Sequence, residues 1–170
     1  MERLPSHQIA RLGLGLVPEG RQVFPNLTVE ENLVATARSS HTHSLKPWTL
    51  ERVYGFFPRL KERRTNLGSQ LSGGEQQMLA IGRALMTNPR LVVLDEATEG
   101  LAPLIRADIW RALGELKGEG LSLIVIDKNL GPLLELADRH FVLEKGVVVW
   151  TGTSGDLRAN AQIVHEYLGV

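Results

Sequence analysis

The stretch LSGGEQQMLAIGRALMTNPRLVVLDEATEGLAP, residues 71–103, decides the fold. Its Ser72 and Glu75 have capping-box spacing, which predicts a helix that begins at the following Gly-Gly step and ends at Asn88-Pro89. The apolar run LVVLD then predicts a strand buried on both faces. A second helix is expected from about Pro103 to Lys117, with a favourable proline in its first turn. A strand between two helices indicates an α/β domain.

The flanking sequence extends this pattern in both directions. Upstream, Thr28 and Glu31 form another capping-box pair and predict a helix in LTVEENLVATAR, with a further helix over Leu50–Phe57. Downstream, SLIVID predicts another buried strand, and FVLEKGVVVW predicts a hairpin that turns near Lys145-Gly146. A short helix is expected over Pro132–Ala137 and one or two helices within 154–168. Strands that alternate with helices at this spacing imply a parallel sheet.

Composition excludes several classes of protein. Lys plus Arg and Asp plus Glu are 19 each among 170 residues, whereas nucleic-acid binders usually show a basic excess. Cysteine is absent, and no apolar run approaches the roughly 20 residues of a membrane span. We therefore expect a cytoplasmic protein that does not bind nucleic acid. The basic cluster Arg59, Lys61, Arg63 and Arg64 is interpreted as a solvated helix end, and His41 and His43 as part of an exposed loop.

Asp95 and Glu96 are the first residues with a chemical role to consider. A carboxylate at the carboxyl end of a parallel strand points into the crevice where such sheets bind ligands. There Asp95 can hold Mg²⁺, and Glu96 can orient and polarise an attacking water. The alternative is that Asp95 only caps the turn that follows.

The segment Ser72-Gly73-Gly74 suits a phosphate. A helix N-terminus offers free backbone N–H groups and a positive dipole end, Ser72 adds a hydroxyl donor, and glycine allows a close approach. Alone, such a turn is also a common structural element. Its position ahead of LVVLDE favours the phosphate role.

Residues 71–103 resemble the signature-to-Walker-B region of ABC-type ATPases, and VPEGRQVFPNLTVEENL (Val17–Leu33) is similar to their glutamine loop. EGLAP, together with Glu19 where glutamine is usual, resembles the ATP-binding subunits of branched-chain amino-acid importers. The resemblance covers essentially the whole chain. Departures from the family are Ala97, where proline is usual, and Lys128, where a histidine or glutamine is usual.

The resemblance implies roles for ATP, Mg²⁺ and partners. A second ATPase subunit, identical or different, and transmembrane permeases are the expected partners, on the inner face of the cell membrane. Lys128 would occupy the switch position or be a surface lysine. The resemblance also implies that Asp95 coordinates the metal, Glu96 is the catalytic residue and Glu19 couples the nucleotide state to the permease. The signature, which would contact the ATP held by the partner, comprises Ser72, Gly73, Gly74 and Glu75. The D-loop comprises Glu99, Gly100, Leu101 and Ala102.

The phosphate loop of the family is not found in these residues, because no Gly-Lys-Ser or Gly-Lys-Thr occurs. The predicted fold is therefore α/β: a partial P-loop NTPase-like (ABC ATPase) domain with a parallel sheet core, a helical subdomain and its N-terminal strands missing. We expect a helical signature subdomain over about 26–88, with 1–25 and 89–170 as the rest of the catalytic core. Either a late gene start or a truncated gene would explain the missing N-terminal strands. We also expect an exposed edge beside LVVLD and weak binding of ATP by the chain alone.

Four functional hypotheses follow. The first is an importer ATPase subunit, and the second a non-catalytic partner that donates only its signature. The third is a gene fragment that does not fold. The fourth, a DNA-repair or chromosome-maintenance ATPase, is disfavoured because no sustained heptads occur between Leu33 and Leu71. The transported solute is not encoded in these residues.

Overall fold

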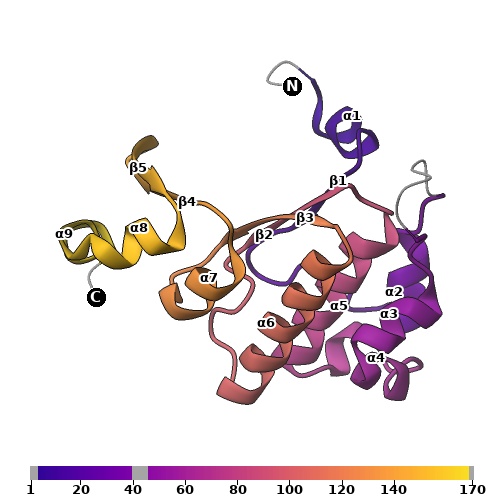
Figure 1. Cartoon of the computed structure of the whole chain (residues 1–170). Coiled ribbons are helices and arrows are strands. Elements are labelled where there is room, and N and C mark those ends of the chain that lie inside the picture. The colour runs from indigo at the N-terminus through magenta and orange to yellow at the C-terminus, as the bar shows by residue number, and fades with distance from the viewer. Residues whose placement is uncertain (1–3, 40–45, 169–170) are drawn as a thin grey trace. The chain divides into compact units, whose positions relative to one another are not determined.

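Strand β2 (Leu91–Asp95) lies at the centre of a three-stranded parallel sheet, between β1 (Leu14–Val17) and β3 (Ser122–Ile126) (Figure 1). The computed structural model describes residues 4–39 and 46–168. These form two compact units, Met1–Asp127 and Lys128–Val170, and each is described by itself. The sheet belongs to the first unit and confirms the predicted parallel α/β architecture.

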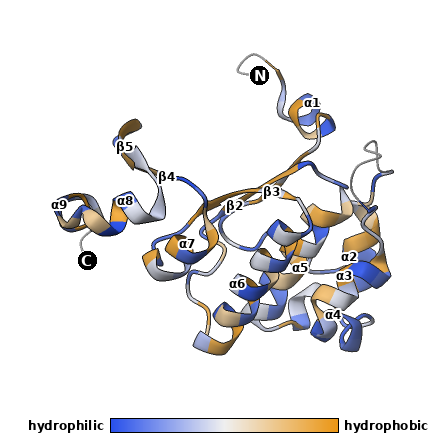
Figure 2. Cartoon of the chain, viewed as in Figure 1, coloured by the Kyte–Doolittle hydropathy of each residue, from blue (hydrophilic) through white to orange (hydrophobic). Residues whose placement is uncertain are grey.

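One face of the sheet is covered by two helices, α5 (Gly73–Met86) and α6 (Pro103–Gly118) (Figure 1). Val17, Val92 and Leu94 point to this face and are almost fully buried. Both helices are apolar toward the core, and the strands are apolar along most of their length (Figure 2). Burial of these apolar side chains is the main stabilising contribution to the unit.

The opposite face of the sheet is uncovered in part. The register places Leu16, Val93 and Ile124 in one row across the three strands. Leu16 is 55% exposed, Ile124 48% and Ile126 49%. The prediction that LVVLD and SLIVID are buried on both faces is therefore wrong, because helices cover only one side. No residue of β3 is buried.

The expected open edge beside LVVLD is also wrong. Both edges of β2 are paired, with β1 on one side and β3 on the other. Strand β1 escaped the sequence-based prediction because LGLV is only four residues long and contains a glycine. Its pairing partner lies more than seventy residues further along the chain.

Helices fill the sequence between β1 and α5. Thr28 caps α2 and Ser72 caps α5, each with the reciprocal side-chain bonds predicted from their spacing. Residues 38–39 and 46–47 are not helical, as expected, while residues 40–45, with His41 and His43, lie outside the described residues. The helices of the first unit outside the sheet crossovers are α1 (Ser6–Arg11), α2 (Val29–Ala35), α3 (Leu50–Phe56), α4 (Pro58–Glu62) and the short 3₁₀ turn η1 (Gly68–Gln70).

The second unit contains the predicted hairpin and terminal helices. Strands β4 (His140–Glu144) and β5 (Val147–Gly152) are antiparallel and turn at Lys145-Gly146, as expected. His140 Nε2 lies 2.8 Å from Ser154 Oγ, which ties the hairpin to the next helix. The helices of this unit are α7 (Leu130–Leu136), α8 (Ser154–Ala159), α9 (Ala161–Ile163) and the π-helical turn η2 (Val164–Leu168).

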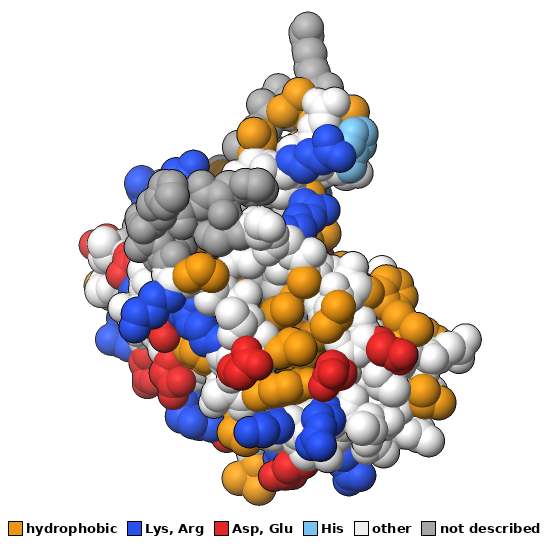
Figure 3. Space-filling model, turned by 90° about the vertical axis from the view of Figure 1, so that its right-hand side faces the viewer, with side chains coloured by type: hydrophobic (Ala, Val, Ile, Leu, Met, Phe, Trp, Pro, Cys, Tyr) orange, Lys and Arg blue, Asp and Glu red, His pale blue; other side chains and the backbone are white. Residues whose placement is uncertain are grey.

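The described helices are too short or too polar to span a membrane. Acidic and basic side chains are interspersed on the face seen in Figure 3, as the equal charge counts suggest. The predicted helical subdomain at 26–88 stays a prediction.

Candidate functional site

The carboxyl ends of β1 and β2 place two of the predicted site segments at the same edge of the sheet. Glu19 lies two residues after β1, Asp95 is the last residue of β2, and Glu96 follows it. Asp95 is half-buried, whereas Glu96 and Glu19 are exposed. Since parallel sheets bind ligands at this edge, the position of both segments suits a nucleotide site.

Glu96 has an unusual backbone conformation. Its φ is 49°, in the left-handed region that non-glycine residues rarely adopt. Its N–H donates to the carbonyl of Ile126 at 2.8 Å, so the turn is anchored to β3. This conformation turns the chain sharply after Asp95, and such strain is typical of functional sites.

A side-chain hydrogen bond joins the ends of β2 and β3. Thr98, 1% exposed, donates its hydroxyl proton to Asp127 Oδ2 at 2.5 Å. The bond holds the segment after Glu96 against the end of β3. It is not predicted by any sequence pattern, because the two residues are 29 positions apart.

The start of α5 is a complete capping box. Glu75 N–H donates to Ser72 Oγ at 3.3 Å, and Ser72 N–H donates to Glu75 Oε2 at 2.8 Å. The Ser72 hydroxyl also interacts with the Glu75 carboxylate, so that the two side chains are held together at the helix start. At 14 residues, α5 is long enough to carry a positive dipole end here. An anion is therefore the ligand that this helix start favours.

Gly73 and Gly74 each pack against a different neighbouring side chain. A Cβ built at Gly73 would lie 2.9 Å from Cζ of Arg21, and one at Gly74 would lie 2.5 Å from Cγ2 of Ile105. Both distances are shorter than real Cβ contacts. The two glycines thus allow the helix start to pack closely against the segment after β1 and against α6.

Glu75 links the helix start to the basic cluster of residues 59–64. Burial raises the pKa of Glu75, but the hydrogen bonds from Ser72 and the charges of Arg63 and Arg59 outweigh it, so that the pKa is lowered overall. The Nε of Arg63 lies 3.6 Å from Glu75 Oε1. Arg63 was expected to be solvated at a helix end, and its side chain, 54% exposed, also faces the Glu75 carboxylate.

The segment after β1 is held in a fixed turn. Gly20 and Arg21 both have positive φ, 81° and 64°, and Gln22 N–H donates to the Gly20 carbonyl at 2.8 Å. Arg83 of α5 donates to the Gln22 carbonyl at 2.5 Å and its guanidinium lies 4.0 Å from the ring centroid of Phe24. The buried Asn32 then fixes Phe24 by two hydrogen bonds of 2.9 Å each.

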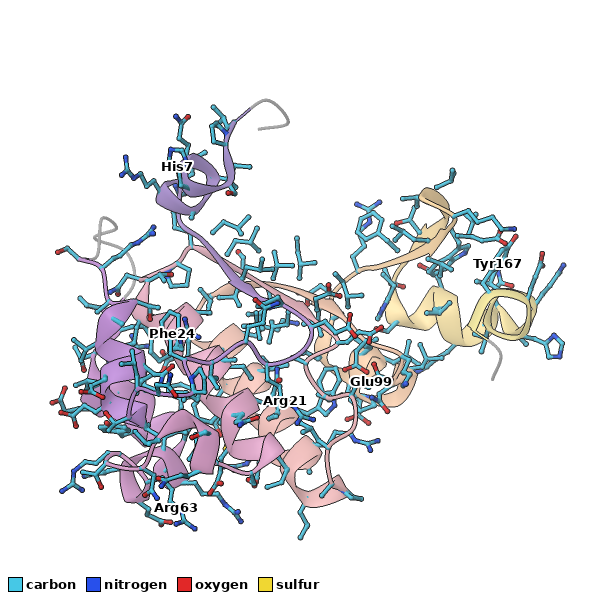
Figure 4. The ribbon with its side chains drawn as sticks, turned by 180° about the vertical axis from the view of Figure 1, so that it is seen from behind. His7, Arg21, Phe24, Arg63, Glu99 and Tyr167 are labelled. Carbon is cyan, nitrogen blue, oxygen red and sulfur yellow. The ribbon has the colours of Figure 1, made fainter. Side chains whose placement is uncertain are left out.

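The predicted D-loop is a turn between β2 and α6. Glu99 N–H donates to the Glu96 carbonyl at 3.2 Å, and Gly100 has a φ of 65° that favours glycine. Leu101 is buried and Ala102 exposed. Figure 4 labels Arg21 and Glu99, which both follow the carboxyl ends of their strands. The second unit begins with Lys128, which is exposed, and its switch role stays a prediction.

A divalent cation fits the carboxylates present. Within residues 4–39 and 46–168 no group of three or more His, Cys, Asp or Glu side chains gathers around a common point. Mg²⁺ does not require such a cage, because it is held by one or two carboxylates together with waters and substrate phosphates. Asp95, half-buried at the end of its strand, meets that requirement.

Four contributors to the site were not recognised from sequence: Arg21, Asn32, Arg63 and Thr98. Each acts through a contact that no local motif predicts, between residues from 8 to more than 50 positions apart. For Arg21 a signal existed, because the neighbouring Gly20 marks a tight turn directly after the apolar run LGLV.

Comparisons with known proteins give a consistent result. The sequence model of the family described as "ABC transporter" matches residues 2–99. The chain is 44% identical to BraG of Pseudomonas aeruginosa, a high-affinity branched-chain amino acid transport ATP-binding protein, over 98% of this chain and 71% of that protein. It is 33% identical to LptB of Haemophilus influenzae, a lipopolysaccharide export system ATP-binding protein, over 98% of this chain and 69% of that protein.

The fold is likewise similar to solved structures. An ATP-binding cassette of an ABC transporter, MJ1267 in its ADP conformation, superposes with a TM-score of 0.74 at 26% identity. The match covers 96% of this chain and 71% of that one. The three-stranded sheet and its helices are therefore those of an ATP-binding cassette.

Proposed function

Because this chain belongs to the ATP-binding proteins of ABC transporters, we propose that it binds and hydrolyses ATP to energise the import of branched-chain amino acids. The observation that carries the proposal is the pairing of two features in one unit. A capped helix begins with Ser72-Gly73-Gly74, and Asp95-Glu96 end the central strand. The high identity to a branched-chain amino acid transport protein supports the choice of solute.

Two such subunits would work as a pair. The hydroxyl of Ser72 and the backbone N–H groups of the α5 start donate to the γ-phosphate of ATP held by the opposing subunit. Residues Glu99–Ala102 form the turn that faces this subunit. The exposed position of Glu99, Gly100 and Ala102 supports that role.

Hydrolysis would use the carboxylates at the end of β2. Asp95 holds Mg²⁺, which when bound neutralises phosphate charge. Glu96 orients and polarises the attacking water, as a carboxylate at hydrogen-bonding distance can. The anchored turn at Glu96 supports this, because a fixed carboxylate loses little freedom in the reaction.

Coupling and location complete the proposal. Glu19, exposed in the fixed turn after β1, senses the nucleotide and contacts the permease. Lys128 reaches the γ-phosphate as a point charge. The protein is then cytoplasmic and peripheral, bound to permeases at the inner face of the cell membrane.

A second candidate function is a partner that supplies only its signature. It is favoured by the complete capping box at Ser72, which orders the helix start without any contribution from Asp95 or Glu96. In that case Asp95 and Glu96 have no catalytic use, and only the α5 start is needed.

Uptake of labelled leucine by cells that depend on this gene separates the two functions. The catalytic proposal predicts that Glu96→Gln and Ser72→Arg both abolish uptake. If only Ser72→Arg does so, the signature-donor function is correct. Uptake that is unaffected by deletion of the gene would contradict transport of branched-chain amino acids.

A further inference from the structure

Arg21 lies at the meeting point of three segments of the candidate site. Its side chain packs against Gly73 at the start of α5, so closely that any Cβ there would overlap it. One of its terminal nitrogens would lie 3.7 Å from a Cβ at Gly100 in the turn after β2. The residue itself follows Glu19 by two positions. One side chain thus touches the start of the signature helix and approaches the predicted D-loop.

The backbone directs Arg21 to this place. Its φ of 64° is in the left-handed region, directly after Gly20 at 81°. A non-glycine residue rarely adopts this conformation, so the surrounding contacts must maintain it. On one side the segment is tied to α5 through the hydrogen bond from Arg83 to the Gln22 carbonyl. The guanidinium of Arg21 is therefore supported by a turn with little freedom.

The charge of Arg21 makes this position unexpected for packing alone. A cation beside a helix N-terminus is disfavoured by the positive end of the dipole. The contact with Gly73 is therefore kept against an electrostatic cost, which indicates that the position of the side chain matters.

We propose that Arg21 is a positioning residue of the signature, which fixes the α5 start relative to the turn after β2 and so sets its fit to a partner's ATP. Arg21 acts through Gly73 and Gly100, and links the Glu19 segment to both. This inference rests on the proposed function of the signature.

The first experiment measures hydrolysis by the complete transporter with Arg21→Ala. Because the ATP is held by the opposing subunit, the KM for ATP should change little, while kcat falls by about tenfold, as expected for a misplaced catalytic element. Arg21→Lys keeps the charge without the planar head and should stay closer to Arg21→Ala than to the wild type. Arg11→Ala, an exposed arginine of α1, is the control and should leave both constants unchanged.

An unchanged kcat in Arg21→Ala would overturn the proposal. Full activity of Arg21→Lys would show that a positive charge is sufficient and that the planar guanidinium group does not position the signature. If the wild-type transporter shows no ATP hydrolysis, the proposed function has failed instead.

A second experiment tests the contact without any activity. Gly73→Ala should raise the Tm in the Arg21→Ala background, because alanine has the higher helix propensity and its Cβ meets no guanidinium. In the wild-type background the gain should be lost. Gly74→Ala is the matched control: its Cβ meets Ile105, so it should lower the Tm equally in both backgrounds. Equal effects of Gly73→Ala in the two backgrounds would show that the contact does not exist in solution.

Discussion

Ser72 and Glu75 hold each other in place at the start of α5. The side chain of each accepts a hydrogen bond from the backbone N–H of the other, at 3.3 Å and 2.8 Å. The residue proposed to donate to a phosphate is therefore also the cap of its own helix. Ligand binding and helix stability depend on the same side chain, and the two effects can be measured separately.

The cap is expected to contribute to the stability of the chain. Ser72→Ala removes the acceptor for Glu75 N–H and should lower the free energy of unfolding by about 1 kcal/mol. Urea denaturation followed by circular dichroism measures this. Ser69→Ala, at an exposed serine of η1, is the control and should stay within about 0.5 kcal/mol of the wild type. Equal losses in both variants would contradict the capping role.

Glu75 should make stability depend on pH. Its pKa lies below the ordinary value of 4.5 in the folded chain, although burial alone would raise it. The folded state then binds fewer protons than the unfolded state, so its contribution is fully present above the unfolded pKa and is lost as pH falls through the lowered folded pKa. In Glu75→Gln, the free energy of unfolding should fall less steeply below pH 4.5. Identical slopes for both proteins would disprove this contribution.

The buried core predicts cooperative unfolding, whereas a gene fragment that does not fold would show no transition. Leu94 in the central strand is 0% exposed, whereas Leu104 at the start of α6 is 81% exposed. Leu94→Ala should therefore destabilise the chain by about 2–5 kcal/mol, and Leu104→Ala should have little effect. Calorimetry of the three proteins measures the difference. A wild-type chain without any thermal transition would contradict the fold.

The uncovered face of the sheet predicts self-association of a polypeptide of these 170 residues. Contiguous apolar side chains at the surface favour association. Ile124→Lys places a charge among Leu16 and Ile126, which are about half exposed, and should reduce association without lowering the Tm greatly. Analytical ultracentrifugation compares the two proteins. If Ile124→Lys unfolds the chain, the side chain is buried and the exposed face does not exist.

Local patterns predicted the elements whose signals lie within the segment itself. The helix start at Ser72 and the turn at Lys145-Gly146 depend on residues a few positions apart, and both are found where expected. Strand β1 was missed because its four residues become a strand only by pairing with Leu91–Leu94. The burial of LVVLD was overestimated for a related reason, since hydrophobicity does not reveal whether a second layer covers a sheet.

The candidate site also contains residues that a local motif predicted and residues that only folding brings together. Asp95, Glu96 and the signature were identified from a contiguous motif, and the structure places them at a strand end and a helix start. The contact of Arg21 with Gly73 and the bond from Thr98 to Asp127 arise only on folding. The sequence therefore predicted the groups that we propose to carry the chemistry, but not the neighbours that contact them.

The central claim is that the α5 start acts on ATP held by a partner. The most direct test mixes this chain with an ABC ATPase subunit that has an intact phosphate loop and a disabled signature. The partner with the disabled signature should hydrolyse ATP at background rate when alone, and addition of this chain should raise the rate. Ser72→Arg, which places a bulky side chain where the phosphate binds, should abolish this stimulation. Stimulation by Ser72→Arg at the wild-type level would contradict the claim.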